Sequence, residues 1–373
     1  MKKIKVSFSF ILLLLLITGC QKNIDKPVAA NSAADLAANT HSTKVPQSLK
    51  DFTQVNLIAD VADYNPLRVD ARLINGWGLS SSPGGTFWIS SERGGNSFVV
   101  NKEGGQGLNP PAIPSPTATT GGHPTGQVFN GTSGFKLPNG NPARFIFCGD
   151  DGVISGWNGG AAAIKKIDNS STAAYFGLAI AADGANTFIY AANFAERKID
   201  VFDKDWNAVN KFFWDADLPA DYSPFNIQAI GNKLYVMYAK INADGEEIHH
   251  PGFGIVDIYN TDGTLDKRFV SNGQLNSPWG VAKAPASFFG TEFENIPNDI
   301  ILIGNFGDGR INAYSSDGTF LGQLRAHSEP IVIDGLWAIM FAPPTATAVD
   351  PNRLYFAAGP AEETHGLFGY LIK

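Results

Sequence analysis

The stretch Asn75-Gly76-Trp77-Gly78-Leu79 has five counterparts further along this chain of 373 residues. The counterparts are His123-Pro124-Thr125-Gly126-Gln127, Ala174-Tyr175-Phe176-Gly177-Leu178, Ser223-Pro224-Phe225-Asn226-Ile227, Ser277-Pro278-Trp279-Gly280-Val281 and Asp334-Gly335-Leu336-Trp337-Ala338. Equivalent positions in the six copies, at 78, 126, 177, 226, 280 and 338, lie 48 to 58 residues apart. A repeat of this length is typical of β-propeller blades, so the sequence predicts six blades.

The residues around each copy predict short β-strands. Runs of β-branched and aromatic residues alternate with turn dipeptides such as Asp183-Gly184 and Asp262-Gly263. Residues 210–214 and 267–270 are two of the predicted fourth, outer strands. The last unit ends with a third strand at 367–372, and we expect residues 54–61 to supply its missing fourth strand.

Pairing of these two segments would close the ring and remove two exposed sheet edges. The predicted fold class is therefore all-β, a six-bladed β-propeller of four-stranded antiparallel blades, whose last blade is completed by an N-terminal strand.

The N-terminus has the layout of an export signal. Lys2, Lys3 and Lys5 precede an apolar run at 6–17 that is short for a membrane span. The run ends in Ile17-Thr18-Gly19-Cys20, which resembles the lipobox of bacterial lipoproteins, where the cysteine is acylated after cleavage. We expect a lipoprotein signal peptide at 1–19, a flexible tether at 20–50 and the propeller at 51–373. The alternative is an ordinary signal peptide that is cut nearby.

Charge and cysteine content indicate which partners and which cellular location to expect. The net charge is −7 and no basic cluster is present, which argues against nucleic acid as a partner. If Cys20 carries lipid, Cys148 is the remaining cysteine and no internal disulfide can form. We expect a monomer that is held at the bacterial cell envelope, at the outer membrane, by its lipid.

Two further segments carry a family resemblance. The segments at 193–203 (Asn-Phe-Ala-Glu-Arg-Lys-Ile-Asp-Val-Phe-Asp) and 304–314 (Gly-Asn-Phe-Gly-Asp-Gly-Arg-Ile-Asn-Ala-Tyr) resemble NHL-type propeller blades. With the repeated stretches they resemble an uncharacterised family of exported bacterial propellers, some of which carry PEP-CTERM sorting tails. The resemblance covers residues 52–373, with a lipobox in place of the sorting tail. That family has no settled activity, so the resemblance implies a fold and an exported setting.

Blade geometry predicts where a site would lie. When the inner strand starts at one face, the link from the preceding blade and the hairpin between strands two and three lie on that same face. Candidate ligand-binding residues at the mouth of the central channel are Asn75, His123, Ser223, Ser277 and Asp334. The hairpins expected around them contain Glu92 and Arg93, Asp150 and Asp151, Asn193 and Glu196, residues 242–250, Asn305 and Asp308, and residues 362–365.

Two functions fit this face. The first is a binding or interaction module without a cofactor, whose ligand is a small molecule, a glycan or a protein. The second follows from a resemblance of Asn75-Gly76 and Asp334-Gly335 to calcium-dependent lactonases and esterases of the senescence-marker-protein type, which implies Ca²⁺ at Asn75 and Asp334. Calcium prefers six or more oxygen ligands, and this ring offers few. The common catalytic motifs are absent, so we favour the binding module over an enzyme.

Overall fold

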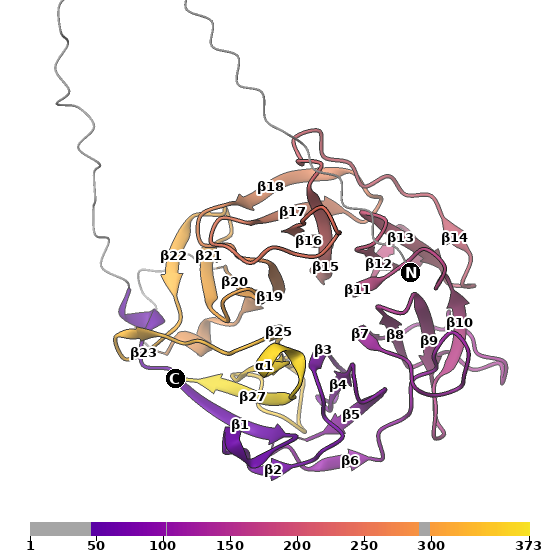
Figure 1. Cartoon of the computed structure of the whole chain (residues 1–373), viewed down its shortest axis with the longest axis horizontal. Coiled ribbons are helices and arrows are strands. Elements are labelled where there is room, and N and C mark those ends of the chain that lie inside the picture. Colours follow the sequence, from indigo (N-terminus) through magenta and orange to yellow (C-terminus); the bar gives the residue numbers. More distant parts are fainter. Residues whose placement is uncertain (1–45, 102, 291–298) are drawn as a thin grey trace, which may run out of the picture. The chain divides into compact units, whose positions relative to one another are not determined.

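The computed structural model describes residues 46–101, 103–290 and 299–373. Six sheets are arranged as blades around a central axis (Figure 1). This arrangement confirms the predicted six-bladed, all-β propeller.

Blades 1 to 3 each contain four antiparallel strands. From the centre outward these are β3 (Gly76–Ser81), β4 (Phe87–Ser91), β5 (Asn96–Val100) and β6 (Gln106–Leu108) in blade 1; β7 (Pro124–Phe129), β8 (Phe145–Gly149), β9 (Val153–Trp157) and β10 (Ile164–Asp168) in blade 2; β11 (Tyr175–Asp183), β12 (Asn186–Asn193), β13 (Lys198–Asp203) and β14 (Ala208–Val209) in blade 3.

Blades 4 to 6 follow the same order from the centre. They comprise β15 (Tyr222–Ile230), β16 (Lys233–Lys240), β17 (Gly254–Asn260) and β18 (Leu265–Ser271) in blade 4; β19 (Pro278–Ala284), β20 (Ile300–Asn305), β21 (Ile311–Ser315) and β22 (Phe320–Gln323) in blade 5; β25 (Leu336–Phe341), β26 (Leu354–Ala358), β27 (Leu367–Ile372), β1 (Thr53–Ala59) and the short β2 (Arg68–Val69) in blade 6. A separate hairpin pairs β23 (Arg325–Ala326) with β24 (Glu329–Pro330).

The N-terminal strand closes the ring as predicted. Strand β1 pairs antiparallel with β27, from Thr53 opposite Ile372 to Ala59 opposite Leu367. Strand β2 then adds to β1 in parallel. The packed part of the chain begins slightly before the expected residue 51, because the 3₁₀ turn η1 (Gln47–Leu49) contributes the fully buried Leu49.

The six repeated stretches form the inner strands, and their small residues let these strands approach closely. A Cβ atom on Gly78 would lie 2.3 Å from the carbonyl oxygen of Thr125 in the next blade. One on Gly126 would lie 2.4 Å from the amide nitrogen of Leu178. The space that remains between the inner strands is about 10 Å³, which is too small for a ligand.

Blade 3 departs from the prediction. Residues 210–214, expected as its fourth strand, lie outside the sheet, and β14 pairs with β13 only at Val201 and Phe202. The physical reason is the path of Lys211, whose ammonium group donates to the carbonyl of Thr261 in blade 4 and pairs with Asp183. The other predicted strand, at 267–270, lies within β18.

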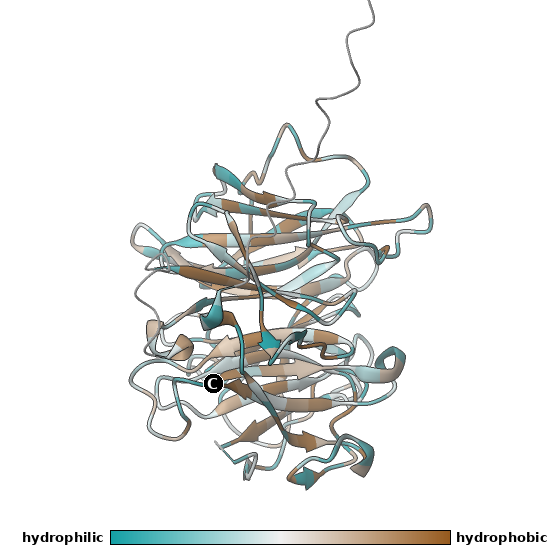
Figure 2. Ribbon diagram, turned by 90° about the vertical axis from the view of Figure 1, so that its left-hand side faces the viewer, coloured by the Kyte–Doolittle hydropathy of each residue, from teal (hydrophilic) through white to brown (hydrophobic). Residues whose placement is uncertain are grey.

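Hydrophobic residues follow the strands of the blades, while many turns are hydrophilic (Figure 2). The buried side chains form clusters between neighbouring blades, for example Ile189 and Ala191 of blade 3 with Ile146 and Cys148 of blade 2. Cys148 is therefore a buried packing residue, and burial raises the pKa of its thiol to about 12. The core consists of these contacts between sheets.

The predicted signal peptide, Cys20 and the tether up to residue 45 lie outside the described residues. Among the residues that are described, no helix has the length and apolar character needed to cross a membrane.

Candidate functional site

An aromatic cluster closes the channel at the face where the inner strands begin. The indole ring of Trp337 stacks on Trp77 with ring centroids 3.6 Å apart and on Phe306 at 3.8 Å. It also contacts Phe225 and Trp279 from blades 4 and 5. These rings pack between blades, and we call this set of five side chains the aromatic plug.

Three of the predicted ligand-binding residues lie buried beside the aromatic plug. Asn75, Ser223 and Ser277 are fully buried. The Ser223 hydroxyl donates to the carbonyl of Phe194 at 2.7 Å, and the Ser277 hydroxyl donates to that of Ile248 at 3.3 Å. Both serines therefore hold loops of this face in place and do not line an open channel.

A cluster of three ionisable side chains lies at this face between blades 1 and 2. The Nδ1 atom of His123 lies 3.3 Å from Oε1 of Glu92 and 3.3 Å from Oδ1 of Asp150. One potential ligand atom from each side chain lies within 4.8 Å of the other two. Glu92 is buried, Asp150 is half-buried and His123 is exposed, so the cluster is open to solvent on one side. We call it the His–carboxylate cluster.

Loops of the two blades position these side chains. Asn75 Nδ2 donates to Oε2 of Glu92 at 2.9 Å, and Trp337 Nε1 donates to Oδ1 of Asn75 at 3.0 Å. The predicted residue Asn75 thus links the aromatic plug to Glu92. In blade 2 the amide of His123 donates to Asp151, which follows Asp150 in the β8–β9 hairpin.

Burial and charge shift the pKa values of the cluster. The neighbouring Asp150 raises the pKa of His123 to about 9, with a smaller contribution from Glu92. Burial raises the pKa of Glu92 above its ordinary value, although the hydrogen bond from Asn75 opposes this shift. At neutral pH the imidazole therefore carries a proton that a bound metal ion would replace.

A strained turn brings a further carboxylate towards the cluster. In α1 (Pro360–Glu363), the residues Ala361, Glu362 and Glu363 have φ angles of 54°, 54° and 61°. Left-handed backbone in three successive residues other than glycine is costly and is found mainly at functional sites. Asp334, another predicted site residue, accepts a hydrogen bond from the amide of Ala361 at 2.8 Å and so helps to hold this turn.

Glu363 is the side chain that the turn presents. Its Oε2 lies 3.4 Å from Nη2 of Arg93, which also lies beside Glu92. Burial raises the pKa of Glu363, and Arg93 opposes that rise while Glu92 and Glu247 add to it. Blades 1, 2 and 6 therefore contribute charged groups to one part of the channel mouth.

The cluster has the ligand types of a transition-metal site. Imidazole nitrogen with two carboxylates suits zinc and neighbouring divalent ions, and structural or catalytic sites often fix a ligand by a hydrogen bond from behind, as Asn75 does for Glu92. The Oδ1 atom of Asp150 is buried, and its neighbour among the described residues is Nδ1 of His123, at 3.3 Å and without the geometry of a good hydrogen bond. Three ligands with one nitrogen fit Ca²⁺ less well.

Comparison with known proteins places the chain among viral relatives. An uncharacterized protein of Acanthamoeba polyphaga mimivirus is 32% identical over 339 residues, which span 86% of this chain and 80% of that protein. A second uncharacterized mimivirus protein is 34% identical over 268 residues, 67% of this chain and 68% of that protein. This chain belongs to their family. No family model matches the chain.

Solved structures agree on the fold of this mimivirus-type family. A streptogramin B lyase has a TM-score of 0.51 at 12% identity, over 86% of this chain and 96% of that chain. A catalytically inactive virginiamycin B lyase from Staphylococcus aureus, with quinupristin, has a TM-score of 0.50 at 12% identity, over 87% and 99%. At such identity the likeness shows the propeller fold alone. These relatives are viral proteins, whereas the resemblance in the sequence implied a bacterial family.

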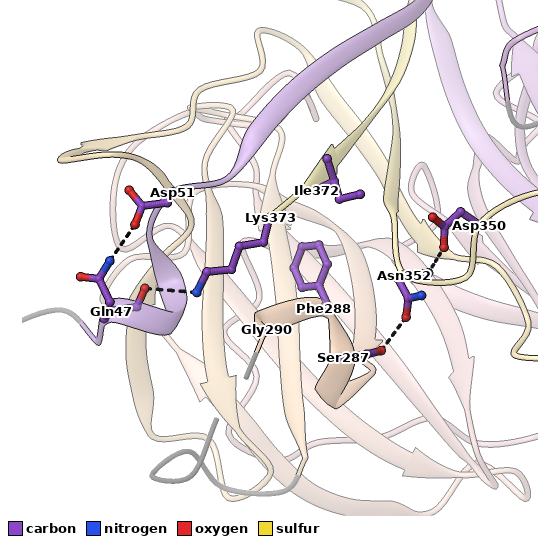
Figure 3. A pocket seen from close by; sticks show the side chains of 9 residues that line it. All are labelled: Gln47, Asp51, Ser287, Phe288, Gly290, Asp350, Asn352, Ile372 and Lys373. Carbon is purple, nitrogen blue, oxygen red and sulfur yellow. Dashed lines mark hydrogen bonds between the residues drawn. The ribbon is translucent and has the colours of Figure 1, made fainter. Parts of the chain in front are cut away.

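A cavity of about 480 Å³ lies away from the cluster, between η1, the 3₁₀ turn η3 (Ala286–Phe289) and the end of β27 (Figure 3). Its polar side chains pair with each other. Gln47 donates to Asp51, and Ser287 donates to Asn352 (Figure 3). Lys373 reaches across to the carbonyl of Gln47. These contacts join the turns to the blade, and the cavity lacks the converging charged groups of the His–carboxylate cluster.

The sequence predicted which loops lie on this face, but it did not predict that Glu92, His123 and Asp150 meet there. Of the five predicted residues, His123 is in the cluster, Asn75 and Asp334 hold its neighbours, and Ser223 and Ser277 do neither. Glu92 and Asp150 were expected in hairpins further from the centre. A signal that could have found them is their common place, directly after the second strand of adjacent blades.

Proposed function

We propose that this protein is a lipid-anchored binding module of the bacterial cell envelope whose channel mouth holds a divalent transition-metal ion between Glu92, His123 and Asp150. The anchor is proposed from Ile17-Thr18-Gly19-Cys20 alone, and the monomeric state from the closed ring. The observation that carries the metal site is the convergence of one nitrogen and two carboxylate ligand atoms within 4.8 Å. Zinc is the ion that these ligands fit best.

The arrangement leaves coordination positions for a ligand. A metal held by three protein groups keeps a position open for water or for a bound molecule. His123 and Asp150 lie on the solvent side, whereas Glu92 and Asn75 lie below them, so a ligand would approach from outside the ring. The aromatic plug keeps it from entering the channel.

Metal analysis of the purified full-length chain tests this proposal. We expect about one zinc per chain by elemental analysis, or binding of added Zn²⁺ by isothermal titration calorimetry with a dissociation constant at least tenfold below that for Ca²⁺. The double variant His123→Gln, Asp150→Asn should lose the ion, while its free energy of unfolding at pH 7 stays within about 1 kcal/mol of that of the metal-free chain. Zinc binding that is unchanged in this variant would reject the site.

The position of Glu363 favours a second candidate function, that of a metal-dependent hydrolase. The strained turn presents a half-buried carboxyl with a raised pKa next to Arg93, which lies beside Glu92, and a carboxylate on this side of the cluster could act as a general base for metal-bound water. The ion would supply Lewis acidity, and Glu363 would accept a proton from the attacking water. A panel of lactones and aryl esters tests this candidate, since zinc-dependent turnover that falls at least 100-fold in Glu363→Gln would establish it.

A further inference from the structure

The outer edge of blade 3 leaves part of a strand without a partner. In an antiparallel ladder, alternate residues direct their N–H and C=O groups to the same side. The Asp203 amide donates outward to the carbonyl of Asn207, and Val201 pairs outward with Val209. Ile199 therefore directs its main-chain groups to the same outer side. The ladder stops at Val209, and within the described residues no hydrogen bond to these groups of Ile199 is found.

The other blades cover this edge more fully. Their outer strands extend over three to seven residues, from β6 to β1 and β18, whereas β14 has two. Figure 1 shows β14 at the outer edge of blade 3. An open edge with free main-chain groups is a template for another strand, which natural proteins usually cover.

Cavities lie along this open edge. A space of about 700 Å³ is lined by Ile199, Asp200 and residues of the segment 210–213 that left the sheet. A second space of about 320 Å³ continues past Phe213 and is lined by Ile199, Trp214 and Tyr222. The two spaces share Lys198, Ile199 and Phe213, so together they form one groove along β13. We call it the blade-3 groove.

Two large aromatic side chains stand exposed beside the blade-3 groove. Phe212 is 81% exposed and Trp214 is 64% exposed, and they are the two most exposed large aromatic residues of the described chain. Their rings lie 6.4 Å apart. Exposed apolar residues that gather at one place mark interaction sites more often than isolated ones do.

We propose that the blade-3 groove binds an extended peptide segment of a partner protein by addition of a strand to β13. The free N–H and C=O groups of Ile199 select an extended segment, because a strand laid beside β13 supplies the matching carbonyl and amide. Ile199 faces Phe213 and the buried cluster, while Lys198 and Asp200 lie on the opposite side of the strand. A strand with alternating apolar and charged side chains therefore fits.

The test uses peptides selected from a phage-displayed library of random seven-residue sequences on the purified full-length chain. A synthetic peptide from the enriched pool is titrated by fluorescence anisotropy, and amide hydrogen exchange is followed at Ile199. We expect exchange at Ile199 to be fast in the free chain and at least tenfold slower at saturation. We expect Phe212→Ala combined with Trp214→Ala to weaken binding at least tenfold.

A matched control is Phe320→Ala on β22, an exposed aromatic residue on the outer strand of blade 5, which should change the affinity less than twofold. The proposal is overturned if no peptide is enriched, if enriched peptides leave exchange at Ile199 unchanged, or if they bind the double variant as tightly as the original chain. Binding of a glycan that depends on Trp214 without protection of Ile199 would also overturn it, in favour of carbohydrate stacking.

Discussion

The centre of the ring and the outer edge of blade 3 use the same kinds of residue in opposite ways. At the centre, Trp337 is 1% exposed, stacks on two rings and donates its N–H to Asn75. At the edge, Trp214 is 64% exposed, and the outward main-chain groups of Ile199 have no hydrogen bond to any described residue. The difference separates the part of the propeller that supplies stability from the part that is free to bind.

The largest effect is expected at the centre. Trp337→Ala should lower the free energy of unfolding by about 3–5 kcal/mol, because it leaves a cavity in the aromatic plug and removes the donor to Asn75. Chemical denaturation measures the change, and Trp337→Phe is the control that retains most of the packing. A loss below about 1 kcal/mol for the alanine variant would mean that the plug does not hold the blades together.

A second prediction compares two outer strands. Ile58 of β1 is fully buried in blade 6, so Ile58→Ala should cost about 3 kcal/mol. Val209 of β14 is half-buried in blade 3, and Val209→Ala should cost less than about 1 kcal/mol. Equal losses in urea denaturation would contradict the expectation that β1 contributes more to stability than β14 does.

Much of this contrast could be predicted from the sequence. The repeat and the orphan strand at 54–61 predicted six blades and their closure, because both depend on local pattern and on the pairing of edges. The path of residues 210–214 could not be predicted, since Phe212, Phe213 and Trp214 favour a strand. Contacts of Lys211 with Thr261 and of Phe213 with Tyr259 draw the segment towards blade 4 instead. Likewise, loop positions followed from topology, whereas the meeting of Glu92, His123 and Asp150 depends on the angle between blades.

A smaller effect on the free energy of unfolding is expected from the His–carboxylate cluster, and it depends on pH. The pKa of His123 is raised to about 9 in the folded chain, above its ordinary 6.5, so protonation favours the folded state. This stabilisation is fully present below pH 6.5 and is lost as the pH rises through about 9. Because the imidazole is exposed and screened, we expect a loss of about 1 kcal/mol.

Denaturation of metal-free protein between pH 6 and 10 measures this loss, taken as the difference between the original chain and His123→Gln. Asp150→Asn should abolish most of the difference, since Asp150 is the main cause of the shift. A difference that stays constant with pH would show that the pair does not contribute.

The smallest effect is expected at the blade-3 groove. Trp214→Ala and Phe212→Ala should each change the free energy of unfolding by less than about 0.5 kcal/mol, because both side chains are exposed in the free chain. Thermal and chemical denaturation would measure this. A loss of 2 kcal/mol or more would assign these rings to the core of the fold.

The pairing of β1 with β27 also determines when the ring can close during biosynthesis. Thr53 finds its partner only when Ile372 has been made. At 5 to 20 residues per second, the ribosome needs roughly 15 to 60 s to make the chain between them. Throughout that time the ring stays open, and the edge of β1 that pairs with β27 has no partner. Because the strand made last is the one that completes the circle, the ring closes only after β27 has been synthesised.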